Sequence, residues 1–424
     1  MINRKSFHIN WLLLCLVPFM GIAKDKGPTL LVYGNSVEAF AAAVQAARSN
    51  VPTLWVVNAD VFTAELSQKQ LSITSNDYMD AGIWLDLLMK ISKSKTKNDS
   101  TAIAAKRGMN PDVVRHALEE IARAETKLSI MMNVSVSKLA MRKKYIDVRL
   151  SNKKKYSFRA VVDATANQAL AAFVAGQDSL QKADKLQRVQ AIPEPLQRTI
   201  VALGAHNTHA MALTFAHILQ YRIGHVFFTS LLPADDSEYI PLRFTVGQAV
   251  GAAAAYCAFF KTNYTRIDVR KLQSELQVFD ARLLPAKNIS ISDPNFKSLQ
   301  KVYLAGLLPL QNADLGYSLD TGGTVSVAAV RPVFHQLYSR SKIWFAENQA
   351  ETFRLKDILS LIRFVSFRGE EIDAQVEKEW SQGLKFKGVF DLEHPVTPYE
   401  FAVLIDRYAN PYTKAINNKG EFVN

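Results

Sequence analysis

The residues whose types and spacing could do chemistry lie where a short apolar run meets an alanine-rich segment. Gly34, Asn35 and Ser36 follow the apolar residues 30–33 and precede residues 38–48, which have the composition of a closely packed helix. The first N–H groups of a helix have no partner within it, and the helix dipole adds a partial positive charge there. This turn therefore predicts a site for phosphate groups.

The glycine pattern at the turn departs from the dinucleotide-binding fingerprint G-x-G-x-x-G. Glycines would be needed at positions 34, 36 and 39, and the chain has Gly34, Ser36 and Ala39. An acidic residue that accepts ribose hydroxyl groups usually follows the second strand, and here Asn58 stands in that place. Glu38 adds a carboxylate to the first helical turn, where it would repel phosphate. The pattern leaves two alternatives, which are a weakened nucleotide site and a βαβ unit that binds nothing.

The elements that must position these residues form an α/β pattern. Residues 29–58 indicate strand, glycine turn, helix and strand, which is one half of a doubly wound, Rossmann-like fold. Alternating segments over residues 128–162 predict a further strand and a small antiparallel sheet. Further elements are expected as helices at residues 83–91, 112–125 and 208–219 and as a strand at 226–230.

Composition and charge are those of a globular protein. Hydrophobic residues make up 48% of the 424 residues and charged residues 21%, which excludes long disorder. The net charge of +12 includes two basic runs, at residues 142–144 and 153–155. Both lie between alternating apolar segments, so we expect solvated hairpin turns there and no nucleic-acid partner. No later stretch is long and apolar enough to span a membrane.

The N-terminal residues are typical of a secretory signal. Arg4 and Lys5 precede the apolar residues 11–20, and Ala23 provides a small residue for cleavage. We expect cleavage after Ala23 and a periplasmic or secreted protein. Cys257 is then the one remaining cysteine, which we expect to be a small buried hydrophobic residue.

Five segments, in the right order, resemble secreted FAD-dependent oxidoreductases of the xanthan-lyase-like class. VVDATANQALAAFVAG (161–176) is similar to the family's motif DATG-D-x-x-L-A-x-x-x-G, with Ala166 in place of the glycine. YGNSVEAFAAA (33–43) resembles YGGTPAGIAAA, and RFTVGQAVGAAAAYCA (243–258) resembles R-x-x-x-x-G-Q-A-x-G-x-A-A-A. PDVVRHALEEI (111–121) and IDVRKLQSEL (267–276) match two of its helices.

The resemblance implies a domain organisation. A signal peptide at 1–23 would precede an FAD/NAD(P)-binding-like domain at 24–285, whose substrate region, about 177–242, is shorter than is usual in the family. Residues 286–424 would form a helical domain whose first helix resembles an S-layer-homology unit. Thr397 and Glu400 have capping-box spacing at the start of a later helix there.

The same resemblance implies FAD as the cofactor and an oxidoreductase activity. It places the cofactor at a set of nine residues: Gly34, Asn35, Ser36, Asn58, Asp163, Thr165, Arg243, Gly247 and Gln248. Gly247 is expected to begin a helix that faces the cofactor. The isoalloxazine ring supplies the hydride chemistry, so no side chain is assigned a catalytic role, although His206 or His209 could act as a substrate-facing acid or base. No metal site is expected. The alternative function is a non-catalytic descendant of the fold that serves as a binding or scaffold module.

Overall fold

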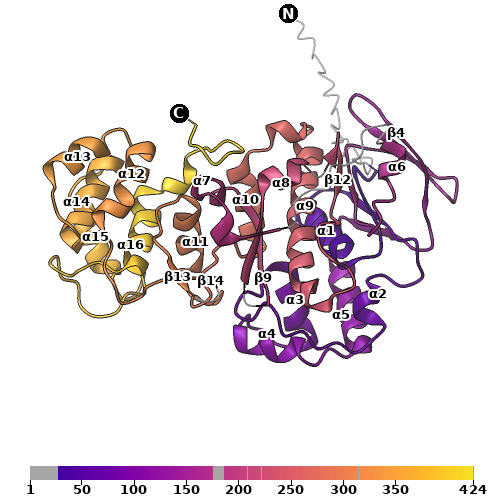
Figure 1. The fold of residues 1–424 in the computed structure, drawn as a ribbon, viewed down its shortest axis with the longest axis horizontal. Coiled ribbons are helices and arrows are strands. Elements are labelled where there is room, and N and C mark those ends of the chain that lie inside the picture. The colour runs from indigo at the N-terminus through magenta and orange to yellow at the C-terminus, as the bar shows by residue number, and fades with distance from the viewer. Residues whose placement is uncertain (1–26, 175–185, 208, 221, 314–315, 424) are drawn as a thin grey trace, which may run out of the picture.

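The computed structural model describes residues 27–174, 186–207, 209–220, 222–313 and 316–423. The predicted signal sequence and its cleavage site lie outside these residues. Figure 1 shows an elongated molecule with the sheet-containing part at one end and a group of helices at the other.

A six-stranded sheet with the strand order β11-β12-β7-β1-β2-β3 forms the centre of the first part. The strands from β12 to β3 are mutually parallel, and β11 is antiparallel at the edge. Its strands are β1 (Leu30–Tyr33), β2 (Thr53–Val56), β3 (Leu128–Met131), β7 (Ala160–Asp163), β11 (Arg222–Ile223) and β12 (Val226–Phe228). The strands β1, β2 and β7 are buried along their whole length, as expected for parallel strands covered on both faces.

Helices cover one face of this sheet. The helix α1 (Val37–Arg48) and the long helix α9 (Ile240–Phe260) pack together against Leu30, Val32 and Val162. Around them lie the other helices of this part: α2 (Ala64–Ser67), α3 (Gly82–Ile91), α4 (Asp99–Lys106), α5 (Pro111–Ala124), α8 (Phe215–Gln220) and α10 (Val269–Val278), with the short turns η2 (Ser237–Tyr239) and η3 (Tyr264–Arg266). Cys257 is buried in α9, as predicted, and burial raises the pKa of its thiol to about 12.

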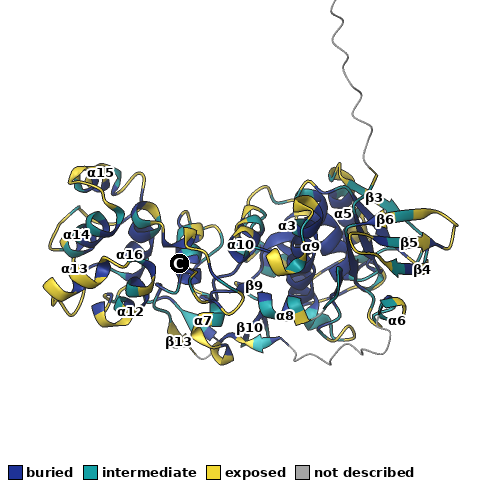
Figure 2. Cartoon of the chain, turned by 90° about the horizontal axis from the view of Figure 1, so that it is seen from above, coloured by how far each residue is buried: buried dark blue, intermediate teal, exposed yellow. Residues whose placement is uncertain are grey.

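An antiparallel sheet covers the other face. Its strands are β4 (Val136–Met141), β5 (Ile146–Leu150) and β6 (Lys155–Phe158), followed by the short helix α6 (Ala171–Val174). The alternate residues Leu31 and Tyr33 of β1 pack against Val148 of this sheet. Residues 142–144 and 153–154 lie in its hairpin turns and Lys155 begins β6, so the predicted hairpin turns are confirmed, and Figure 2 shows exposed residues at these tips.

A second hydrophobic core lies under the C-terminal helices. These are α11 (Phe296–Leu304), α12 (Val327–Leu337), α13 (Ser341–Glu347), α14 (Leu355–Ser366), α15 (Glu371–Glu379) and α16 (Pro398–Leu404), with the π-helical turn η4 (Ile405–Ala409) and the turn η5 (Pro411–Thr413). The core also takes in Leu203 and Ala212, which come from the middle of the chain. They belong to a sheet of β8 (Gln187–Arg188), β9 (Ile200–His206) and β10 (His209–Thr214), flanked by η1 (Val189–Ala191) and α7 (Glu194–Gln197).

The predicted α/β class is confirmed, with its parallel sheet, antiparallel insertion and helical C-terminal region. The capping box of Thr397 and Glu400 is also confirmed. The expected helix at 208–219 is wrong: β10 pairs with β9 up to Thr214, and helix α8 begins only at Phe215. The C-terminal region is not all helical, since β13 (Gln311–Ala313) pairs with β14 (Gly316–Ser318).

Two glycines of α9 set its distance from α1. A Cβ atom on Gly247 would lie 2.5 Å from the carbonyl oxygen of Glu38, and one on Gly251 would lie 2.5 Å from that of Ala42. These two glycines, four residues apart, share one face of the helix. The backbones of α1 and α9 can therefore approach only because both side chains are absent.

We expect Gly251→Ala to destabilise the protein by about 1–3 kcal/mol, because the helices must move apart. In an open helical site the same change would instead stabilise by up to about 1 kcal/mol, so the sign of the effect is diagnostic. Urea unfolding of the variant measures it. Gly108→Ala, in the turn after α4, is the control for an open site, since no atom of the described residues lies within 4 Å of a Cβ atom there; equal behaviour of the two variants would contradict the prediction.

Candidate functional site

A cavity of about 380 Å³ opens at the carboxyl ends of β1 and β7. Ligands of doubly wound folds bind at this edge of the sheet. The lining comes from four separate stretches of chain: Asn35 and Ser36, Asn58 and Glu65, Ala164 to Asn167 with Ala169, and Ala234 with Arg243.

Gly34 holds the two turns beneath the cavity together. Its φ of +137° is outside the range that other residues favour, and a Cβ atom there would lie 2.5 Å from the carbonyl oxygen of Ala164. Ser36 then caps α1: its hydroxyl accepts from the Ala39 N–H at 3.2 Å and donates to the Ala164 carbonyl at 2.9 Å. The glycine is thus needed for the close approach of the β1 and β7 turns.

Asp163 and Thr165 shape the second turn. The Asp163 carboxylate accepts hydrogen bonds from the Thr165 hydroxyl at 2.6 Å and from the Leu170 N–H at 2.7 Å. Burial raises the pKa of this carboxyl group, although the hydrogen bonds oppose the shift. Asp163 is fully buried and does not line the cavity.

A carboxylate of the chain itself occupies the helix N-terminus. The Glu65 Oε1 atom accepts the Val37 N–H of α1 at 2.6 Å, and Glu65 Oε2 lies 2.5 Å from Arg243 Nη1. The short helix α2, which carries Glu65, is held against the same turn, because the N–H of its N-cap residue Thr63 donates to the Asn35 side chain at 2.7 Å. Glu65 therefore stands where the N–H groups of α1 would meet a phosphate.

Arg243 joins Glu65 to a second carboxylate. Its Nε and Nη2 atoms contact the two carboxylate oxygens of Glu38 at 2.6 and 2.7 Å, a bidentate pair. Arg243 is only 2% exposed and Glu38 only 3%. This cluster of Glu38, Glu65 and Arg243 has a formal charge of −1, and pairing with both carboxylates raises the pKa of Arg243 even though burial opposes it.

The environment of Glu65 in this cluster disfavours its charged form. Burial, together with the nearby charge of Glu38, raises the pKa of Glu65 above its ordinary value of 4.5, while Arg243 and the Val37 N–H oppose the shift. The Glu65 carboxyl group thus gains a proton more readily than an exposed glutamate, and it loses its negative charge when it does so.

The structure brings most of the predicted site residues together. Asn35, Ser36, Asn58, Thr165 and Arg243 line the cavity, and Gly34 and Asp163 support its floor. The two remaining predicted residues, Gly247 and Gln248, lie elsewhere. Their helix α9 begins at Ile240, so the expected helix start at Gly247 is wrong, and that glycine contacts α1 instead. The Gln248 amide donates to the Gln45 side chain at 2.9 Å, within the helix layer.

Sequence reasoning missed Glu65. It lies in a polar, irregular stretch without a motif, and its partner Arg243 is 178 residues away. Glu38 was the one feature of the sequence that could have indicated a buried ion-pair cluster. It is a carboxylate in the first helical turn, and a buried carboxylate needs a cation beside it. Arg243 is among the residues predicted to bind the cofactor, and the structure pairs it with the carboxylates of Glu38 and Glu65.

His206 and His209 lie opposite each other on β9 and β10. The ring of His206 stacks on Tyr239 with centroids 3.7 Å apart, and its Nε2 atom lies 3.4 Å from Asp236. Within the described residues, no three histidine, cysteine or acidic side chains are grouped as metal ligands would be. Nor does any described helix combine the length and apolar character that crossing a bilayer requires.

Comparison with known proteins finds one family match, in the first part of the chain. Residues 29–221 match the family model of FAD dependent oxidoreductases, which supports FAD as the predicted cofactor. No curated protein matches the chain.

Three solved structures are similar to part of this chain. The bacillithiol disulfide reductase Bdr from Staphylococcus aureus is 13% identical over 33% of this chain and 38% of its own, with a TM-score of 0.25. The tetracycline destructase Tet(51) is 13% identical over 39% and 44%, with a TM-score of 0.26. An oxidoreductase from Agrobacterium tumefaciens is 12% identical over 33% and 37%, with a TM-score of 0.21. In each case the match spans less than half of the other chain.

Proposed function

We propose that this chain is an FAD-dependent oxidoreductase-like protein that binds the diphosphate of FAD at the N-terminus of α1. The observation that carries the proposal is the cavity at the carboxyl ends of β1 and β7, where residues predicted from sequence gather over that helix end. The family match over residues 29–221 supports the same cofactor. The substrate is left open, since a fold does not specify one.

The residues around the cavity fit FAD only after one rearrangement. The N–H groups of Ser36 and Val37 and the guanidinium of Arg243 would hold the diphosphate, and Asn58 would hold the ribose. Glu65 must first leave Val37, because its carboxylate and a phosphate compete for the same N–H group. Bound there, FAD would supply the hydride-transfer chemistry, and the protein would supply binding and orientation.

The proposal also covers where the protein is located and the class to which it belongs. Export to the periplasm or beyond is supported by the positively charged start, the apolar residues 11–20 and the small residue Ala23. The xanthan-lyase-like class is supported by the motifs quoted above, and the S-layer-homology-like C-terminal domain at 286–424 by the resemblance of its first helix to such a unit. An attachment role for that domain would suit an exported enzyme.

The visible spectrum of the purified protein, before and after incubation with FAD, tests the proposal. We expect flavin absorbance that stays with the protein, and a rise in Tm with added FAD. A ligand at 100 times its Kd stabilises the native state by about 2.7 kcal/mol.

Riboflavin, which lacks the diphosphate, is the matched control and should raise Tm much less than FAD. A colourless protein whose Tm does not respond to FAD would refute the proposal. It would leave the doubly wound fold as a scaffold without a cofactor.

A further inference from the structure

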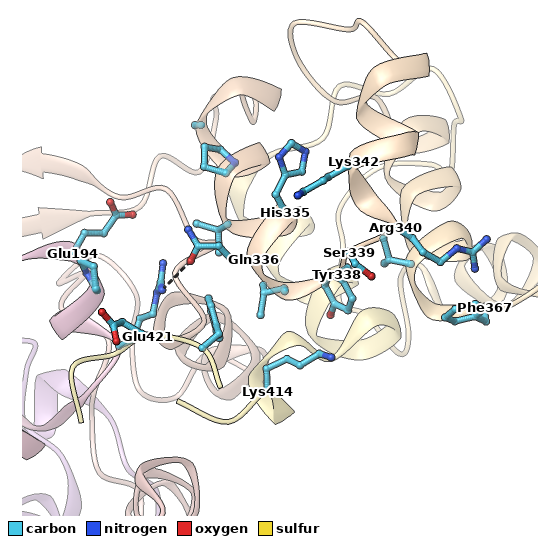
Figure 3. A pocket seen from close by; sticks show the side chains of 18 residues that line it. Glu194, His335, Gln336, Tyr338, Ser339, Arg340, Lys342, Phe367, Lys414 and Glu421 are labelled. Carbon is cyan, nitrogen blue, oxygen red and sulfur yellow. Dashed lines mark hydrogen bonds between the residues drawn. The ribbon is translucent and has the colours of Figure 1, made fainter. Parts of the chain in front are cut away.

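A second hollow, of about 970 Å³, lies between α7, α12 and the residues that follow η5 (Figure 3). Its lining includes four cationic side chains, those of Arg198, Arg340, Lys342 and Lys414. We propose that this hollow binds a small anionic molecule that carries two or more carboxylate or phosphate groups. This site is separate from the FAD cavity and does not depend on the proposed function.

The charges of the hollow are out of balance. Its carboxylates are Glu194 and Glu421, and within the described residues none of the four cations lies within 4 Å of any carboxylate oxygen. Elsewhere the chain pairs its cations readily, for example Arg354 and Lys356 with Glu393. The four cations of the lining thus outnumber its two carboxylates, and none of the four forms a salt bridge within the described residues, although the charge of Glu194 acts on Arg198 from beyond 4 Å.

Arg198 is a buried cation at one end of the hollow. It is only 5% exposed, and burial lowers the pKa of its guanidinium. Its Nη1 atom donates to the Gly420 carbonyl at 3.2 Å, whereas its buried Nε atom has no acceptor among the described residues. The guanidinium lies over the ring of Phe422, 4.5 Å from its centre. A cation removed from water without a carboxylate partner is costly, and a bound anion would offset that cost.

The other end of the hollow combines cations with aromatic rings. Figure 3 shows Lys342 beside His335, and Lys414 reaching toward Tyr338 from the other side. The ammonium of Lys414 lies 5.8 Å from the centre of the Tyr338 ring. Arg340 lies over Phe367, which is 78% exposed and has a left-handed backbone with φ of 58°. This rim can contact the carbon skeleton of a ligand whose charged groups face the cations.

The size of the hollow sets the class of ligand. A volume of 970 Å³ is near the upper end of the range for small-molecule sites, so several charged groups can be accommodated together. Glu194 and Glu421 bound the end near Arg198 and would repel a continuous polyanion that ran past it. A compact di- or trianion fits this distribution of charge.

Calorimetric titration of the full chain with citrate and, separately, with pyrophosphate tests the proposal. We expect one of the two to bind with a stoichiometry of one, and the preferred probe distinguishes a carboxylate ligand from a phosphate ligand. The variant Lys342→Gln/Lys414→Gln should raise the Kd about tenfold or more, because each lost charge-assisted contact weakens binding. Both lysines are exposed, so the variant should keep the fold.

Lys378→Gln/Lys387→Gln is the matched control, with two exposed lysines of the same region outside the hollow. It should bind the probe as the unchanged protein does. Arg198→Gln, checked for folding by circular dichroism, should also weaken binding. The proposal is overturned if neither probe binds, or if both lysine pairs lower the affinity equally, since that result would show attraction by net charge alone.

Discussion

Glu65→Ala should strengthen FAD binding about tenfold or more, which corresponds to ~1.4 kcal/mol or more. The change frees the Val37 N–H and one face of Arg243 and removes a negative charge from the place of the diphosphate. Two unit charges 4 Å apart interact by about 4 kcal/mol at the effective dielectric constant typical of protein surfaces, and partial exposure of Glu65 reduces this value. Titration of the apoprotein with FAD, followed by flavin fluorescence, measures the effect.

The matched control for this variant is Glu125→Ala. Glu125 is also paired with an arginine, Arg48, at 2.8 Å, but it lies outside the cavity. It should leave FAD binding unchanged. If Glu65→Ala binds FAD no more tightly than the unchanged protein, Glu65 does not compete with the diphosphate, and the proposed position of FAD is wrong.

The pH dependence of the same titration provides a second measurement. The pKa of Glu65 is raised, so its carboxyl group takes up a proton at a pH above 4.5 as the solution is acidified. Protonation removes the competing charge, and the affinity of the unchanged protein should rise toward that of Glu65→Ala. The difference between the two proteins should therefore be largest at pH 8 and become smaller as the solution is acidified toward the raised pKa of Glu65. If the difference does not depend on pH, the Glu65 side chain weakens FAD binding through its size and not through its charge.

Arg243→Met should lower the free energy of unfolding by about 3–5 kcal/mol, the usual effect of breaking a buried ion pair from one side. The Glu38 carboxylate would be left in a site with 4% side-chain exposure and without its bidentate partner. The double variant Glu38→Gln/Arg243→Met removes that uncompensated charge and should recover part of the loss. Urea unfolding of the three proteins measures these differences.

Arg48→Met is the matched control for this prediction. Arg48 also bridges two carboxylates, those of Asp86 and Glu125, but all three side chains are between 16% and 19% exposed. Water can solvate the carboxylates of Asp86 and Glu125 once Arg48 is removed, so the loss of unfolding free energy should be much smaller. Equal losses for Arg48→Met and Arg243→Met would show that burial of the cluster contributes little.

The sequence predicted a parallel βαβ unit because β1 and β2 are short, continuous apolar runs bounded by turn residues. It placed residues 156–162 in the antiparallel sheet, whereas the structure divides them between β6 and the parallel strand β7. It also predicted Thr397 at a helix start, since capping depends on neighbours within three residues. The helix at 208–219 failed for a physical reason. The apolar pattern of β10 is compatible with both a helix and a strand, and its pairing with β9 makes it a strand.

The candidate site was predictable only in part. Five of its residues could be found from motifs: Asn35, Ser36 and Thr165 in the turns after β1 and β7, Asn58 after β2, and Arg243 in the motif of α9. Glu65 and its pairing with Arg243 depend on contacts across 178 residues, which no local pattern encodes. Gly247 was assigned to a cofactor because of its motif, whereas the structure shows it at the contact of two helices.

The second core draws on distant parts of the chain, and this has a consequence for synthesis on the ribosome. Leu203 and Ala212 emerge well before Phe401 and Leu404, which complete the apolar surroundings of that core. At a typical elongation rate of about 5–20 residues per second, the strands β9 and β10 wait ten seconds or longer for those partners. During that interval their apolar side chains are open to chaperones and to neighbouring nascent chains, so slowing translation should make aggregation of this protein worse.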